Sequence, residues 1–184
     1  DGDEVVVPTQ TFVSTASCVV NNGGTPIFCE IGHNHLIDYD DLKAKISDNT
    51  KAVIIVHFGG LIHPDIWEIK KYLKERNIYL IEDAAHAHGA KIDNVFAGNI
   101  GDFGCFSFYS TKIMTTGGEG GFISTNNEKL FDLCSSFGAI GIDKKSKNEI
   151  YINAGSNNRL TEFQAIMGIS QLNKLESFVK HRNK

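Results

Sequence analysis

The chain has 184 residues, of which 18 are Lys or Arg and 22 are Asp or Glu, giving a formal net charge of −4. This length is enough for one domain with a real core, and the 41% hydrophobic content is ordinary for a globular protein. The negative charge argues against a nucleic-acid-binding role, because no large basic surface is implied. No stretch approaches the roughly 20 apolar residues that span a bilayer, so we expect neither nucleic acid nor membrane as a partner.

Apolar runs alternate with amphipathic segments along the first half of the chain, and this alternation predicts a doubly wound α/β sheet. The predicted strands are residues 4–7, 26–31, 51–57, 78–81, 103–108 and 121–124. The predicted helices are residues 12–20, 126–137 and 160–179, and two more that begin at Asp38 and Pro64. Within residues 51–57, the run Ala-Val-Ile-Ile-Val (52–56) is apolar on both faces, which is typical of a parallel strand covered by helices on each side. In the helix of residues 126–137, we expect Leu130, Phe131, Leu133 and Cys134 to face inward.

The four cysteines, Cys18, Cys29, Cys105 and Cys134, are scattered and form no Cys-x-x-Cys pair. This spacing argues against a disulfide framework and against a zinc site. We therefore expect buried, reduced cysteines in a cytoplasmic protein, and no metal.

Two polar residues follow predicted strands at places where ligands bind in open α/β sheets. Asp83 comes just after the strand of residues 78–81, and Lys112 follows the strand of residues 103–108. Pyridoxal phosphate needs a lysine to hold its aldehyde as a Schiff base and a carboxylate to keep its ring nitrogen protonated. Its phosphate needs hydroxyls and backbone N–H groups. Asp83, Lys112 and Ser107 could supply these parts, although a buried Asp–Lys ion pair would fit the same spacing.

Three blocks of the sequence resemble the DegT/DnrJ/EryC1/StrS family of sugar aminotransferases, which depend on pyridoxal 5′-phosphate and have fold type I. The blocks are residues 81–90 (IEDAAHAHGA), 101–112 (GDFGCFSFYSTK) and 118–121 (GEGG). The resemblance covers nearly the whole chain and implies a three-layer α/β/α fold with a mostly parallel central sheet. Because family members are longer, we expect residues 1–184 to be the cofactor-binding large domain, truncated at both ends. The upstream phosphate loop and the C-terminal small domain would then be absent.

The resemblance also implies how individual residues would bind the cofactor. Asp83 would bond to the pyridine nitrogen, and Phe12 and Ala85 would pack on opposite faces of the ring. Ser107 would bind the phosphate. His86 stands where many family members carry Gln, and it would bond to the phenolic oxygen of the cofactor.

Two further residues carry the implied catalysis and assembly. Lys112 would be the catalytic lysine, which holds the cofactor and then moves a proton as a neutral amine. Asn157 lies in Gly155-Ser156-Asn157-Asn158-Arg159, which resembles a family segment whose asparagine reaches the phosphate in the neighbouring subunit. Asn158 departs from the family's usual aromatic residue there. The resemblance thus implies a homodimer with shared active sites.

The implied activity is transfer of an amino group, from glutamate as donor, to a keto group of a nucleotide-linked sugar, in polysaccharide or antibiotic sugar biosynthesis. A pyridoxal phosphate-dependent sugar dehydratase of the same family is an alternative, although dehydratases can carry His where Lys112 stands. A metal-dependent hydrolase is a second alternative. Its ligands would come from Asp83, His86 and His88, together with His57 and His63, but it would leave Lys112 without a role.

Overall fold

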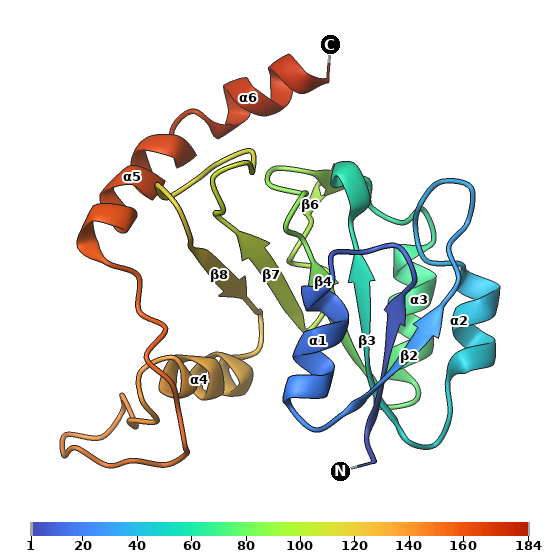
Figure 1. Cartoon of the computed structure of the whole chain (residues 1–184), viewed down its shortest axis with the longest axis horizontal. Helices are drawn as coiled ribbons and strands as arrows, with labels where there is room; N and C mark the ends of the chain where they lie inside the picture. The colour runs from blue at the N-terminus through green and yellow to red at the C-terminus, as the bar shows by residue number, and fades with distance from the viewer. Residues whose placement is uncertain (1, 184) are drawn as a thin grey trace.

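The computed structural model describes residues 2–183, and its centre is a six-stranded sheet in the order β2-β1-β3-β4-β7-β8 (Figure 1). Its strands are β1 (Glu4–Pro8), β2 (Thr25–Cys29), β3 (Thr50–Val56), β4 (Tyr79–Asp83), β7 (Phe103–Ser107) and β8 (Gly121–Ser124). Strands β2, β1, β3, β4 and β7 run parallel to one another, and β8 at the edge runs antiparallel to β7. The expected mostly parallel sheet is therefore confirmed.

Helices cover both faces of this sheet, which makes three layers (Figure 1). The helices are α1 (Ser14–Asn21), α2 (Tyr39–Lys45), α3 (Ile66–Lys74), α4 (Glu128–Phe137), α5 (Glu162–Leu172) and α6 (Leu175–Arg182). Val53 and Ile55 of β3 pack with α2 and α3 on one face, whereas Ile54 packs with Val19 of α1 on the other. Because successive side chains of a strand point to opposite faces, a strand covered on both sides must be apolar throughout.

The start of α2 follows from its sequence. Asp38 is the N-cap, and its carboxylate accepts hydrogen bonds from the backbone N–H groups of Asp40 and Asp41, each at 2.9 Å. This contact satisfies two amides that no helical carbonyl can reach. None of the helices within residues 2–183 is both long enough and apolar enough to cross a membrane.

Two expectations about the second half of the chain are wrong. The single helix predicted over residues 160–179 is two helices, α5 and α6. The amide of Lys174 donates to the carbonyl of Gln171, three residues back, so the regular helical ladder stops there. In α4, Phe131 and Leu133 are not inward but exposed, because Leu130 and Cys134, four positions apart, share the half-buried face and the other two side chains lie on either side of it.

The structure contains a short hairpin between β4 and β7 that the sequence did not predict. Strands β5 (Lys91–Ile92) and β6 (Val95–Phe96) pair antiparallel through the two-residue turn Asp93-Asn94. Both turn residues have positive φ angles, 49° and 63°, which Asp and Asn tolerate better than most residues.

The carboxylate of Glu82 connects β4 to the segment before β7. Glu82 is fully buried, and one oxygen accepts from His57 Nε2 and the amide of Gly98, each at 2.8 Å. The other oxygen accepts from the amides of Ile100 and Gly101, at 2.7 and 2.6 Å. Burial alone would raise the pKa of Glu82, but the hydrogen bonds from His57, Gly101 and Gly98 together lower it below its ordinary value. The buried residue that precedes Asp83 is therefore rigidly held.

Replacing Glu82 with Gln should lower the free energy of unfolding by about 3–5 kcal/mol at pH 7, because it breaks a buried charged network. Whichever way the new amide turns, its NH₂ group faces two donors, so no orientation restores all four bonds. Urea unfolding of both proteins measures the loss. Glu75→Gln, on an exposed residue, is the matched control and should change stability by less than about 0.5 kcal/mol.

The same network predicts a pH dependence with a defined sign. The pKa of Glu82 is lower in the folded state, so its stabilisation is fully present above the ordinary value of 4.5 and is lost as the pH falls. The stability difference between wild type and Glu82→Gln should stay constant from pH 7 to about pH 5 and shrink below pH 4.5. A difference that grows at acid pH would contradict this account.

Candidate functional site

The carboxyl ends of the parallel strands gather the predicted site residues at one edge of the sheet. Asp83 is the last residue of β4, and Ser107 is the last residue of β7, which is the next strand in the sheet. Ala85 and His86 lie in the loop that leaves β4, and Lys112 lies in the loop between β7 and β8. The fold thus brings residues that are up to 29 positions apart (112 − 83) to a single edge.

The carboxylate of Asp83 is held by a residue that the sequence did not single out. Its Oδ2 accepts a hydrogen bond of 2.9 Å from the hydroxyl of Thr15, in α1. Its Oδ1 accepts one of 3.2 Å from the amide of Ala85, and its backbone carbonyl accepts from the amide of His57 at 3.1 Å. No local motif signals Thr15, because it is 68 residues from Asp83 in the sequence.

The loop that carries Lys112 is closed by hydrogen bonds on both sides. The amide of Lys112 donates to the carbonyl of Tyr109 at 2.9 Å. Phe108 receives a bond of 3.0 Å from the hydroxyl of Thr115 and donates its own amide to Gly120 at 2.7 Å. These contacts bring the loop back to its starting strand, and they leave Lys112 half-buried rather than free in solvent.

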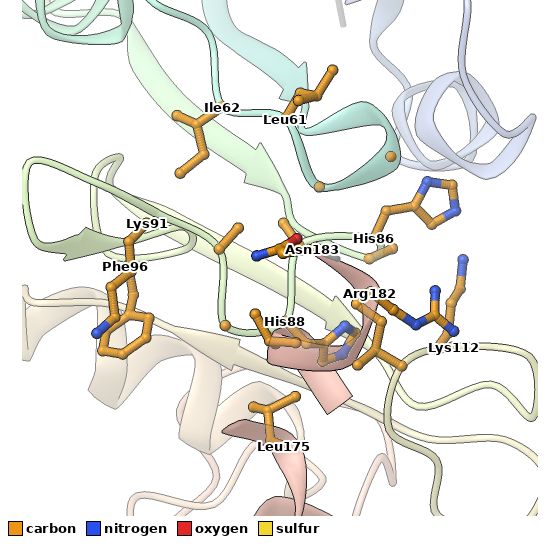
Figure 2. A pocket seen from close by; sticks show the side chains of 18 of the residues that line it. Leu61, Ile62, His86, His88, Lys91, Phe96, Lys112, Leu175, Arg182 and Asn183 are labelled. Atoms are coloured by element: carbon orange, nitrogen blue, oxygen red, sulfur yellow. The ribbon is translucent and has the colours of Figure 1, made fainter. Parts of the chain in front are cut away.

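A cleft opens beside this edge, between the loop after β4 and helix α6 (Figure 2). Figure 2 shows His86 and Lys112 at the same end of the cleft, with Arg182 of α6 nearby. Burial, with a smaller contribution from the positive charge of Lys112, lowers the pKa of His86, so its imidazole is neutral at pH 7. The negative charge of Asp83 opposes this lowering of the pKa of His86.

His88 lies deeper in the same loop and has a different environment. It is 3% exposed, its ring lies 5.4 and 5.9 Å from those of Phe106 and Phe108, and neither of its nitrogens has a hydrogen-bond partner within residues 2–183. Burial lowers the pKa of His88 to about 4, so the ring is neutral at pH 7. This position suits a supporting role beneath the site.

Phe12 is at the same edge as Asp83, whereas Asn157 is not. Phe12 lies just before α1 and is 75% exposed, so one face of its ring is open. Asn157 forms an isolated bridge with Ala139, which follows α4. Helix α4 begins after Ser124, which pairs with the start of β7, so this region lies at the opposite edge of the sheet (Figure 1). A role of Asn157 in a partner's site is compatible with this separation and stays a prediction.

The histidines do not form the cluster that a metal-dependent hydrolase would need. His57 bonds to Glu82, as described above. His63 contacts the carbonyl of Ile37 through Nε2 and accepts the amide of Asp65 at Nδ1, both at 3.0 Å. Within residues 2–183 no three His, Cys, Asp or Glu side chains are arranged to hold a metal ion. The geometry therefore does not support this alternative.

Comparison with known proteins agrees with the arrangement of the sheet and its edge. The family model of the DegT/DnrJ/EryC1/StrS aminotransferase family matches residues 1–184. The chain belongs to this family. The DegT/DnrJ/EryC1/StrS fold is confirmed by an X-ray structure of an aminotransferase from Psychrobacter cryohalolentis. That structure matches with a TM-score of 0.91 and 35% identity, over 96% of this chain and 47% of the other.

Two other DegT/DnrJ/EryC1/StrS relatives are informative. GDP-perosamine synthase of Escherichia coli O157:H7 is 35% identical over 99% of this chain and 50% of its own length. The structure of ntda from Bacillus subtilis, with bound cofactor PMP, has a TM-score of 0.85 and 31% identity over 96% of this chain and 40% of that protein. The chain spans about half the length of the curated relatives it matches. The assignment of residues 1–184 to the large domain of a longer protein stays a prediction.

Proposed function

We propose that this chain forms the cofactor-binding part of an aminotransferase that uses pyridoxal 5′-phosphate to transfer an amino group to a keto group of a nucleotide-linked sugar. The observation that carries the proposal is that Asp83 and Ser107 end the neighbouring strands β4 and β7, and that His86 and Lys112 line the cleft beside this edge. A carboxylate, a hydroxyl and an amine at one site are what the ring nitrogen, the phosphate and the aldehyde of this cofactor require. The GDP-linked name of the relative from Escherichia coli supports the substrate class.

The residues at the edge fit the cofactor in chemistry as well as in position. Asp83 is half-buried, and because each of its oxygens accepts one bond from the residues that the structure describes, it can also accept a proton-bearing ring nitrogen. Ala85 has a small side chain that would let the ring approach, and Phe12 has an open ring face for stacking. Ser107 Oγ accepts from the amide of Tyr109, which leaves its O–H free for a phosphate oxygen. His86 would bond to the phenolic oxygen.

When bound, the cofactor withdraws electrons from the α-carbon of an amino donor and makes its proton acidic. Lys112 Nζ, as a neutral amine, would accept that proton and pass it to the cofactor, and in the second half of the reaction it would move a proton back from the cofactor to the carbon of the acceptor sugar. The hydrogen bonds that close the loop fix the backbone from which the side chain of Lys112 extends. Asp83 would hold the ring nitrogen by a charge-assisted hydrogen bond.

We propose glutamate as the amino donor on the basis of the family resemblance, and a homodimer in which Asn157 completes the partner's site. Exposed apolar side chains on β8, α4 and α5 support a further interface, since isolated domains rarely expose so many. These residues are Phe122, Ile123, Phe131, Leu133, Phe163, Ile166, Ile169 and Leu172. We place the reaction in the cytoplasm, where the four free cysteines would stay reduced.

The test uses the protein that contains this chain, loaded with pyridoxal 5′-phosphate and supplied with isotopically labelled glutamate. A panel of keto sugars linked to different nucleoside diphosphates is added, and products are identified by mass spectrometry. We expect the label to appear as an amino group on one of the sugars. Loss of water from the sugar without gain of the label would favour the dehydratase alternative. The absence of any cofactor-dependent change in the sugars would overturn the proposed function.

A further inference from the structure

The hydroxyl of Thr15 is buried directly behind the site and is aimed at Asp83. Thr15 is 5% exposed, and its Oγ1 donates to Asp83 Oδ2 at 2.9 Å. A second hydroxyl, Thr11 Oγ1, lies 2.7 Å from Thr15 Oγ1. Two threonine hydroxyls in series thus end on the carboxylate that is proposed to hold the ring nitrogen.

The direction of these two hydrogen bonds follows from the number of protons available. An ionised carboxylate can only accept, and a hydroxyl has one proton to donate. Because Thr15 gives its proton to Asp83, the bond between the hydroxyls must be donated by Thr11. Hydrogen bonds that run in one direction polarise one another, so the Thr11 hydroxyl strengthens the contact of Thr15 with Asp83.

The backbone of Thr15 contacts that of Phe12, the residue proposed to stack on the ring. Its amide donates to the carbonyl of Phe12 at 3.0 Å, in the turn that opens α1. One residue therefore holds both Phe12, whose ring face is open, and Asp83, whose carboxylate faces the same edge. Without the hydroxyl of Thr15, the bond from Ala85 at 3.2 Å is the remaining side-chain contact of Asp83 among the described residues.

We propose that Thr15 is a positioning residue, which fixes the orientation of the Asp83 carboxylate relative to Phe12 so that the ring nitrogen and the ring face are bound together. The inference rests on the proposed function. It adds a role for α1, an element that the sequence connects to the cofactor only through Phe12. Helix α1 is also held by Val19, which packs in an apolar cluster with Val7 and Ile54. The helix is therefore anchored independently of the Thr15 hydroxyl.

The test compares Thr15→Val, which keeps the branched shape but loses the hydroxyl, with Thr15→Ser, which keeps the hydroxyl. For Thr15→Val, we expect the dissociation constant of pyridoxal 5′-phosphate, measured by absorbance titration, to rise roughly 10-fold or more. A hydrogen bond to a charged group is worth about 1.5–3 kcal/mol, and about 1.4 kcal/mol is tenfold in affinity. We also expect kcat to fall more than KM rises, and Thr15→Ser to restore the affinity to within about threefold.

Thr50→Val is the matched control, because the hydroxyl of Thr50 is also buried but contacts the amide of Ser47, away from the site. It should leave the cofactor affinity unchanged. If Thr15→Val loses stability but the folded protein binds the cofactor like the wild type, the inference is overturned and Thr15 is only structural. A wild-type protein that binds no cofactor would overturn the proposed function together with the inference, so the two failures can be told apart.

Discussion

Replacing Lys112 with Ala should reduce the rate of amino transfer by about 10⁴-fold or more, the largest effect that we expect from any single substitution. The variant lacks the amine that would hold the cofactor and move the proton, and no other lysine lies in the loop between β7 and β8. Two measurements check this result: single-turnover transfer from labelled glutamate, and the visible absorption band of lysine-linked cofactor.

Lys112→Arg tests whether the positive charge of the side chain is enough for activity or whether a neutral amine is needed. Arg keeps the positive charge beside His86, but it stays protonated at neutral pH and cannot act as a neutral amine. It should therefore be as inactive as Lys112→Ala. Lys74→Ala, on the exposed side of α3, is the control and should retain activity within about twofold. Retention of the absorption band and of transfer in Lys112→Ala would remove Lys112 from the mechanism.

Replacing Asp83 with Asn should lower kcat by about 10²–10³-fold, with little change in fold, because one charge-assisted contact is lost at the ring nitrogen. Asn is nearly the same shape, and its oxygen can still accept the hydroxyl of Thr15. What it cannot supply is the negative charge that keeps the nitrogen protonated and the ring an electron sink. Steady-state kinetics with the loaded protein and thermal unfolding of the same samples provide the comparison.

Asp102→Asn is a chemically matched control for this substitution. The carboxylate of Asp102 accepts the amide of Leu80 at 2.8 Å, at the opposite end of β4 from Asp83. An Asn at position 102 can keep that bond, so we expect activity within about twofold of wild type. Equal losses in the two variants would show that the effect of Asp83→Asn comes from the fold and not from the ring nitrogen.

Much of the sheet could be predicted because its strands carry their signal locally. Residues 52–56 are apolar on both faces, and Asp83 comes shortly after the apolar run of residues 78–81, so both the strands and the edge they share followed from sequence period and composition. The N-cap role of Asp38 also followed, since capping involves only the next few residues. The sequence also predicted that Asp83, Ser107 and Lys112 lie at one edge, because each ends or follows a strand that its own local pattern indicates.

The sequence by itself therefore determined the alternation of strands and helices, and with it the edge at which the acid, the hydroxyl and the amine gather. Only the tertiary structure decided what holds them. Thr15 meets Asp83 across 68 residues, and Glu82 meets His57 and three amides from another loop. Such contacts depend on the rotation of α1 against the sheet and on the path of a loop. Side-chain periodicity reports which face of an element is buried, but it does not report which distant group lies opposite that face.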